Sequence, residues 1–301
     1  MVMAPFVLAH LSDPHLAPLP RPRLHELAGK RAIGYMNWTR NRHRIHRREV
    51  IDALVDDLHA QAADHIAVTG DLVNIALPSE IAQARAWLDT VGPPADVTLV
   101  PGNHDAYVQS AIAGFSAAWG DYMRGDAAPV STSGFPFVRR RGPVTLIGVS
   151  SGVPTRPFIA TGTLGRIQLA ALDTMFTALE TAETFRVLLI HHPLQSEERR
   201  RHARLTDSDL LCELLRRHGV DLVLHGHDHR HAVTWFDGPS TRIPAIGVPS
   251  ASVAAGSHRE AAAYNLFGID RRDGRWRVEL TTRGFSRAGE IGELRRETLV
   301  A

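Results

Sequence analysis

Five short groups of His, Asp and Asn residues each follow directly after an apolar run of the sequence. In chain order they are Asp13-Pro14-His15, Gly70-Asp71, Gly102-Asn103-His104-Asp105, His191-His192-Pro193 and Gly226-His227-Asp228-His229. Imidazole and carboxylate groups are donors that borderline divalent cations accept, and two such ions about 3.5–4 Å apart need a bridging group plus further ligands for each ion. The five groups together predict a centre for two metal ions.

The spacing within these groups supports that prediction. Asp13 and His15 are two positions apart, so in an extended segment both side chains lie on the same side and can converge on one ion. His227 and His229 repeat the spacing. Cys212 is the only cysteine, which excludes an internal disulfide and a thiolate zinc site. Any metal must therefore be bound by His, Asp, Asn or Glu.

The order and placement of the five groups resembles the calcineurin-like metallophosphoesterase family, over roughly residues 6–266. The resemblance implies a dinuclear centre in which Asp71 bridges the two ions. The first ion would be held by Asp13, His15, Asp71 and His229, and the second by Asp71, Asn103, His191 and His227. His192 could replace His191 chemically, but the family usually presents His-x-Pro, which favours His191. The donor set suits Mn, Fe, Zn, Co or Ni, so two divalent or trivalent ions of open identity are expected.

The resemblance also implies an activity, which is metal-dependent hydrolysis of phosphate esters by hydroxide formed at the ions. His104 would donate a proton to the leaving group, and Asp105 would orient the His104 ring. With only two anionic ligands, two divalent ions leave the site at about +2, which suits a phosphate ester and its transition state.

The substrate class is less defined than the reaction. The motifs are similar to those of bacterial class III cyclic-nucleotide and glycerophosphodiester phosphodiesterases, which favours a small phosphodiester, but monoesterases share them. One alternative is a hydrolase of a membrane-associated pyrophosphate or lipid precursor, similar to UDP-diacylglucosamine hydrolases. Another is a non-catalytic scaffold that uses the metal edge to bind a partner. The sequence offers neither a helix-turn-helix nor an aromatic-basic platform, so nucleic acid is not an expected partner.

A basic insertion at about residues 17–48 follows the first motif. Its part from 20 to 48 combines arginines with aromatic and apolar residues: Arg31, Arg40, Arg42, Arg44, Arg47, Arg48, Tyr35, Met36 and Trp38. It is either a solvated surface or a lid over the metal centre that binds anionic substrate groups or a membrane surface. A second basic stretch, 199–204, could line the same opening.

Alternating strands and helices must position these motifs. Apolar runs at 6–11, 65–68, 97–100, 144–149, 187–190 and 222–225 predict buried strands, and apolar residues spaced three and four apart predict helices at 49–62, 79–91, 164–179 and 207–217. After His229 four further strands are expected, at 232–236, 243–248, 265–269 and 276–282, in a second and more antiparallel sheet. We therefore expect an α/β protein with a four-layer αββα sandwich of two mixed sheets, which places ligands at the ends of strands.

Composition agrees with one globular unit. The 301 residues are 44% hydrophobic and 22% charged, with a formal net charge of +2. We expect a single domain over 1–283 and a C-terminal tail over 284–301, of which the last dozen residues are charged and loosely held. No apolar run approaches the roughly 18 residues of a spanning helix, and the opening run lacks the basic region of a signal peptide. A cytoplasmic protein is expected, with peripheral contact at the inner membrane surface if the insertion binds lipid.

Overall fold

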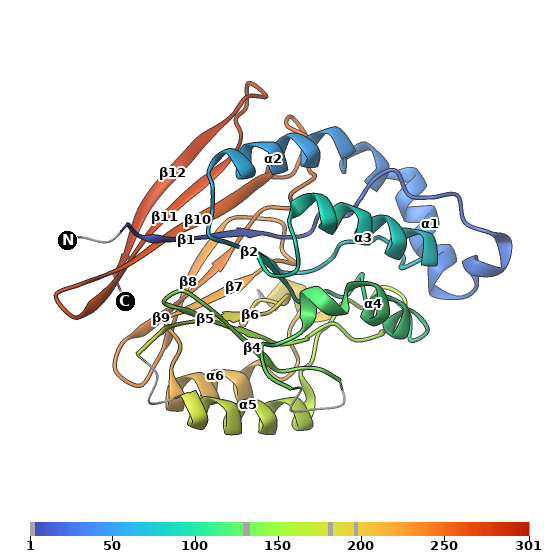
Figure 1. The fold of residues 1–301 in the computed structure, drawn as a ribbon. Helices are drawn as coiled ribbons and strands as arrows, with labels where there is room; N and C mark the ends of the chain where they lie inside the picture. The colour runs from blue at the N-terminus through green and yellow to red at the C-terminus, as the bar shows by residue number, and fades with distance from the viewer. Residues whose placement is uncertain (1–3, 129–132, 180–182, 196–197, 301) are drawn as a thin grey trace.

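Two six-stranded mixed β-sheets pack face to face between two layers of helices (Figure 1). The computed structural model describes residues 4–128, 133–179, 183–195 and 198–300. Helices α2 (Arg48–Ala60) and α3 (Pro78–Val91) cover the first sheet, and α5 (Gly165–Leu179) and α6 (Ser208–His218) cover the second. The predicted four-layer αββα sandwich is therefore confirmed.

The first sheet has the strand order β12-β11-β10-β1-β2-β3. Its strands are β1 (Phe6–Leu11), β2 (His65–Val68), β3 (Val97–Leu99), β10 (Ala263–Arg272), β11 (Arg275–Phe285) and β12 (Ile291–Val300). The pairs β1·β2 and β2·β3 are parallel, with Leu8 opposite His65 and Ile66 opposite Val97. Because these three strands point the same way, the motifs that follow them emerge at one edge of the sheet.

The second sheet has the order β4-β5-β6-β7-β9-β8. Its strands are β4 (Phe137–Arg141), β5 (Val144–Gly148), β6 (Phe185–Leu189), β7 (Leu222–His225), β8 (Ala232–Asp237) and β9 (Arg242–Gly247). Strands β5, β6, β7 and β9 are parallel, so the loops after β6 and β7 also open at one edge. The expectation that the last strands form a sheet of their own was wrong. The β8–β9 hairpin extends the second sheet through β7, and β10 to β12 extend the first sheet through β1.

The four predicted helices are present, with ends within two residues of the expected positions. In α2 the buried residues Ile51, Leu54, Val55 and Leu58 follow the three- and four-residue spacing of an amphipathic helix. The sequence did not indicate α1 (Lys30–Arg40), in which Trp38 is the only buried residue, so no apolar stripe marks it. The remaining helical segments are α4 (Ala111–Trp119), η1 (Leu24–Leu27), η2 (Arg42–Arg44), η3 (Gly120–Met123) and η4 (Glu198–Ala203).

The prediction of a loosely held C-terminus was wrong. Strand β12 pairs antiparallel with β11 along its length, with Val278 opposite Leu299. Charged side chains of this strand form ion pairs: Arg296 pairs with Glu293 at 2.6 Å and with Glu279 of β11 at 2.5 Å. A charged composition here reflects an exposed edge strand rather than a mobile tail. The boundary between a domain at 1–283 and a separate segment stays a prediction.

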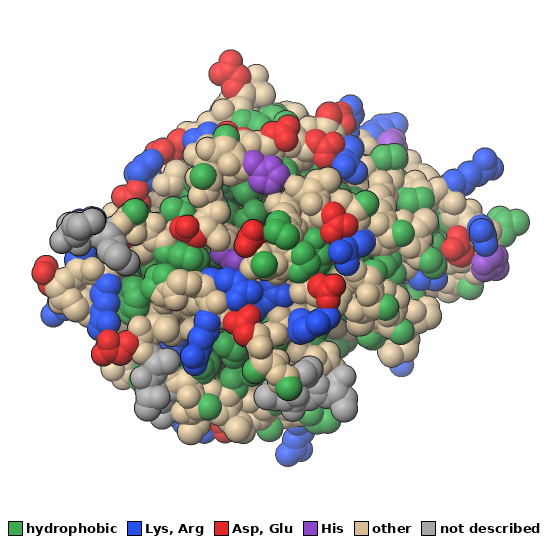
Figure 2. Space-filling model, in the orientation of Figure 1, with side chains coloured by type: hydrophobic (Ala, Val, Ile, Leu, Met, Phe, Trp, Pro, Cys, Tyr) green, Lys and Arg blue, Asp and Glu red, His purple; other side chains and the backbone are tan. Residues whose placement is uncertain are grey.

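The basic and acidic side chains are mixed on the face of the molecule seen in Figure 2. Figure 2 shows Lys and Arg interspersed with Asp and Glu over one face of the molecule. Among the residues that the structure describes, no helix is both long enough and apolar enough to cross a membrane.

Candidate metal centre

Loops from both sheets meet at the strand ends. The loop after β1 runs beside the loop after β2, because the Asp13 amide donates to the Gly70 carbonyl and the His15 amide donates to the Asp71 carbonyl. Across the two sheets, an isolated bridge joins Ser12 to Ser250, and the Ser250 hydroxyl donates to the Asp13 carbonyl at 2.6 Å. Residues far apart in the sequence are therefore held together by backbone contacts.

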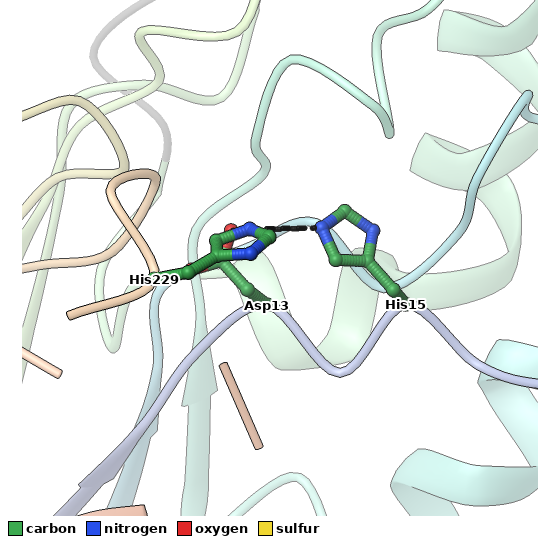
Figure 3. A group of neighbouring side chains, drawn as sticks. All are labelled: Asp13, His15 and His229. Atoms are coloured by element: carbon green, nitrogen blue, oxygen red, sulfur yellow. Dashed lines mark hydrogen bonds and ion pairs between the residues drawn. The ribbon is translucent and has the colours of Figure 1, made fainter. Parts of the chain in front are cut away.

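Four of the predicted ligands form a first cluster, of which Figure 3 shows Asp13, His15 and His229. His229 Nε2 lies 3.0 Å from Asp13 Oδ1 and 3.2 Å from His15 Nε2. His15 Nε2 is also 3.8 Å from Asp13 Oδ1 and 3.7 Å from Asp71 Oδ2. Donor atoms about 2.0–2.2 Å from one ion lie roughly 3–3.5 Å from each other in tetrahedral coordination, so these separations fit a shared cation.

The second cluster shares Asp71 with the first. Asp71 Oδ2 is 3.5 Å from His191 Nε2, which in turn lies 3.2 Å from Asn103 Oδ1. His227 Nδ1 is 2.9 Å from Asn103 Oδ1 and 3.3 Å from His191 Nε2. The structure thus brings all seven predicted ligand side chains into two adjacent groups, and one oxygen of Asp71 faces both.

Hydrogen bonds hold these side chains in orientations that suit ligands. Asp71 Oδ1 accepts the His104 amide at 2.7 Å, which leaves Oδ2 turned towards the two clusters. The second ring nitrogens of His15 and His191 lie 3.1 Å from the Val73 carbonyl and 2.6 Å from the Thr69 carbonyl. A neutral ring that donates Nδ1–H to a carbonyl presents an unprotonated Nε2, as metal-binding histidines do.

The backbone around the site is strained in a way that favours a functional role. Asp13, His15, Asp71, His227 and His229 all have positive φ, between 37° and 69°. Non-glycine residues seldom adopt this region, and each such conformation costs on the order of 1–3 kcal/mol. Five of the seven predicted ligands adopt it, so the fold bears this cost to aim their side chains inward.

Glycines make room beside the carboxylates. A Cβ on Gly102 would overlap the Asp71 carboxylate, and a Cβ on Gly226 would overlap the Ser12 hydroxyl and Asp13 Oδ2. Asp13 Oδ1 is buried, and its contact with His229 Nε2 at 3.0 Å lacks the geometry of a hydrogen bond. A buried carboxylate oxygen without a donor, beside imidazole nitrogens, is the donor set expected of a cation site.

The charges at the site also favour cation binding. Burial lowers the pKa of His191, but the nearby Asp71 carboxylate outweighs it and raises this pKa to about 10. For Asp13, burial acts to raise the pKa, yet the charge of His229 keeps it below its ordinary value. The same negative field that retains a proton on His191 can hold a metal ion when that proton is released.

The structure distinguishes His191 from His192. His192 Nδ1 lies 2.7 Å from the Ser151 hydroxyl and its Nε2 lies 3.1 Å from the Ala160 carbonyl. Both ring nitrogens of His192 are thereby used outside the clusters, whereas His191 faces Asp71 and Asn103. Of the two adjacent histidines, only His191 can reach the centre.

The predicted role of Asp105 in orienting His104 was wrong. The Asp105 carboxylate accepts the backbone amides of Asp71, Leu72 and Gly102, each at 2.8 Å. It therefore fixes the loop that carries Asp71 against the loop that carries Asn103. The His104 ring is held instead by the Asn74 carbonyl, 2.6 Å from Nδ1, and by stacking on Tyr107.

The basic insertion lies over the centre. A cavity of about 670 Å³ opens above the clusters, and Asp71, Asn103, His104, His227 and His229 form part of its wall. The insertion contributes Asn37, Arg40, Asn41, Arg42, Arg44 and Ile45. The remaining wall residues are Ala160, Ala203, His258 and Arg259. Of the second basic stretch, Ala203 reaches the cavity wall, while the side chains of Arg199 and Arg200 lie outside the described part of the chain. Trp38 is buried and stacks on His46, so it is not presented to a membrane.

Some residues at the site were not singled out from the sequence. The His46 ring packs 4.8 Å from that of His15, and its Nδ1 lies 2.8 Å from the Ser252 hydroxyl. Arg259 Nη1 lies 2.9 Å from His229 Nδ1. Neither residue is part of a motif, and only the fold brings them to the centre.

Comparison with known proteins agrees with this geometry. A model of the calcineurin-like phosphoesterase family matches residues 6–231. Among solved structures, a dimetal phosphatase from Danio rerio is similar with a TM-score of 0.63 at 13% identity, covering 99% of each chain. A purple acid phosphatase from yellow lupin (Lupinus luteus) seeds has a TM-score of 0.62 at 12% identity, covering 98% of this chain and 53% of that one. At these identities the structures show a shared fold. No curated protein matches the chain in sequence.

Proposed function

The chain belongs to the calcineurin-like phosphoesterase family, and we propose that it hydrolyses phosphodiesters at a dinuclear metal centre. The proposed ligands are Asp13, His15, Asp71 and His229 for one ion and Asp71, Asn103, His191 and His227 for the other. The observation that carries the proposal is the position of Asp71 Oδ2, which lies 3.7 Å from His15 Nε2 and 3.5 Å from His191 Nε2. One carboxylate oxygen faces both clusters, as a bridging ligand must.

Residues around the two ions would have separate roles in the reaction. When bound, the metals would polarise the phosphate and supply a nucleophilic hydroxide at neutral pH. Asp71 would fix the distance between the two ions, and Asp105 would hold the backbone that positions Asp71. His104 would face the leaving group, and we expect its ring to supply a proton to a poor leaving group.

A diester is favoured over a monoester by the space above the centre. The cavity of about 670 Å³ is larger than one phosphate needs, and residues of the insertion and Arg259 line it in addition to the predicted ligands. Pockets of this size accommodate ligands of the size of a nucleotide. The cavity therefore has room for a phosphorus atom at the clusters that carries two substituents.

A panel of substrates tests the proposal. Protein loaded separately with Mn, Fe, Zn, Co or Ni is assayed on cyclic nucleotides, glycerophosphodiesters, nucleotide-sugar lipids and simple monoesters. We expect turnover that requires metal and a higher kcat/KM for diesters than for monoesters with the same leaving group. If protein with two bound ions hydrolyses no phosphate ester, the catalytic proposal is wrong and a partner-binding scaffold becomes the better account. A preference for monoesters would contradict the diester assignment alone.

A lipid-linked substrate is a second candidate, supported by two exposed apolar side chains of the insertion. Leu24 is 92% exposed and Met36 is 44% exposed, so both could enter a membrane surface or contact acyl chains. In that case turnover of nucleotide-sugar lipids should rise when they are presented in detergent micelles or vesicles, while turnover of water-soluble diesters stays constant. Equal turnover in both presentations would count against this candidate.

A further inference from the structure

The arginines of the basic insertion fall into two sets. Arg47 and Arg48 do not line the cavity and are paired with carboxylates, at 2.7 Å from Glu49 and 2.8 Å from Asp52. Arg40, Arg42 and Arg44 line the cavity over the metal centre. Among the described residues, none of these three has a carboxylate within ion-pairing distance. Cations gathered without counter-ions in a partly enclosed site favour an anionic ligand.

The cavity wall is strongly positive beyond these three residues. Arg259 and His258 contribute to it from the C-terminal part of the chain, and Asp71 is the only acidic residue among the described residues that line it. Burial lowers the pKa of Arg42 to about 10, so its guanidinium stays charged at neutral pH. A single scissile phosphate held by the clusters would not reach all of this positive surface.

Arg42 defines the side of the scissile bond on which the additional negative charge belongs. Its Nη1 lies 3.1 Å from His104 Nε2 and 3.4 Å from His104 Nδ1. Because the Asn74 carbonyl accepts the proton on Nδ1, the Nε2 atom of a neutral ring accepts from Arg42. Arg42 therefore stands where His104 is expected to meet the leaving group, and the ring must first take up a proton at Nε2 before it can supply one to an alkoxide.

We propose that the leaving group of the substrate is itself a phosphate, bound by Arg42 with help from Arg40 and Arg44. This proposal rests on the proposed phosphoester hydrolysis and names its substrate class, a phosphoanhydride in which the attacked phosphorus carries one organic substituent. A phosphate leaves readily as an anion, so it depends less on a proton donor than an alkoxide does and more on a fixed positive charge. Arginine suits that role because its planar guanidinium binds two phosphate oxygens at once.

The bonds balance in this reaction. An oxygen from water forms a bond to the attacked phosphorus, and the bond between that phosphorus and the bridging oxygen breaks. The bridging oxygen departs with the electron pair as part of the second phosphate, whose charge Arg42 stabilises. The proton released from water passes to solvent, and the products are two phosphate monoesters.

A matched pair of substrates tests the proposal in the metal-loaded protein. A dinucleoside diphosphate and a dinucleoside monophosphate with the same nucleosides differ only by the second phosphate. We expect wild type to prefer the diphosphate. Arg42→Gln should lower its kcat/KM for the diphosphate by roughly 10–100-fold, the value of a charged hydrogen bond, and change the monophosphate far less. Arg47→Gln removes the same charge from the insertion outside the cavity, and it should leave both values unchanged.

Binding provides a readout that does not depend on turnover. Calorimetry should show that Arg42→Gln loses affinity for inorganic pyrophosphate but keeps its affinity for inorganic phosphate. If Arg42→Gln does not fold, Arg42→Lys serves instead, since it keeps the charge but not the paired donors. A lipid-linked diphosphate in detergent micelles, assayed beside the dinucleoside diphosphate, distinguishes a lipid from a nucleotide as the source of the second phosphate.

The outcomes separate the two proposals. Equal losses on the two dinucleoside substrates, with pyrophosphate affinity unchanged, would overturn the leaving-phosphate proposal and leave phosphoester hydrolysis intact. If wild type with two bound ions hydrolyses neither substrate nor any diester of the panel, phosphoester hydrolysis itself is overturned, and the substrate class with it.

Discussion

Asp71→Asn is expected to remove bound metal from both positions at once and to reduce turnover by more than about 100-fold, beyond the 10–100-fold typical of residues that only support ligands. The reason is that Asp71 Oδ2 faces His15 Nε2 in one cluster and His191 Nε2 in the other. Asparagine keeps the shape of the side chain but removes the charge that would hold the two ions together. Metal content is measured by plasma mass spectrometry after exhaustive dialysis.

The matched control for this variant is Asp52→Asn, which removes one carboxylate from an exposed ion pair with Arg48 on α2. This control should retain wild-type metal content and activity. If Asp71→Asn retains two ions per chain with wild-type affinity, Asp71 is not the bridge. Loss of one ion only would reassign Asp71 to a single metal.

His104→Ala is expected to retain both ions and to lose roughly 10²–10⁴ in rate on diesters with alkyl leaving groups, as removal of a positioned proton donor does. The His104 ring is fixed by the Asn74 carbonyl at 2.6 Å and by stacking on Tyr107, so its position is defined before substrate arrives. For bis(p-nitrophenyl) phosphate the loss should be much smaller, because p-nitrophenolate is a stable anion. Steady-state kinetics on both substrates measure the difference.

The two leaving groups separate a proton donor from a metal ligand. Side-chain atoms of His104, His15 and Asp71 lie close enough together to bind one ion. The measurements must therefore distinguish a metal ligand at His104 from a proton donor. Equal losses on both substrates together with reduced metal content would make His104 a ligand instead of an acid. His25→Ala, which removes an exposed histidine from η1, should change neither activity nor metal content.

The strand-end motifs were predictable from the sequence because each motif consists of residues that are adjacent in the chain. A short apolar run followed by Asp-x-His indicates where a buried strand ends and which side chains converge, and parallel strands then bring such ends to one edge. The structure places Asp13 Oδ1 and His229 Nε2 3.0 Å apart, although 216 positions separate the two residues in the sequence. The family pattern was needed to join these motifs, since spacing within each of them says nothing about contacts between them.

Features that depend on long-range packing were not predictable. The carboxylate of Asp105 was assigned to its neighbour His104, whereas it accepts backbone amides from the Asp71 loop. Arg259 carries no motif, and it reaches His229 only because of the path of the chain after β9. The charged composition of the last residues predicted a loose tail. These residues instead form β12, which pairs with β11, and Arg296 of β12 forms an ion pair with Glu279 of β11.

The basic insertion was predictable from the sequence only in part. Its arginine content indicated either a solvated surface or a lid, and composition could not decide between them. In the structure, Lys30 donates to the Thr155 hydroxyl at 2.8 Å and Arg31 donates to the Ile75 carbonyl at 3.1 Å, so the segment is docked across the loops of the site. These contacts join residues far apart in the sequence, which explains why composition alone left both readings open.

The most direct test of the account is the position of the metals. Crystals of metal-loaded protein, examined by anomalous diffraction at the absorption edge of the loaded metal, should show two peaks about 3.5–4 Å apart on either side of Asp71 Oδ2. One peak should lie among Asp13, His15 and His229, and the other among Asn103, His191 and His227. A single ion, or two ions that do not share Asp71, would contradict the central claim.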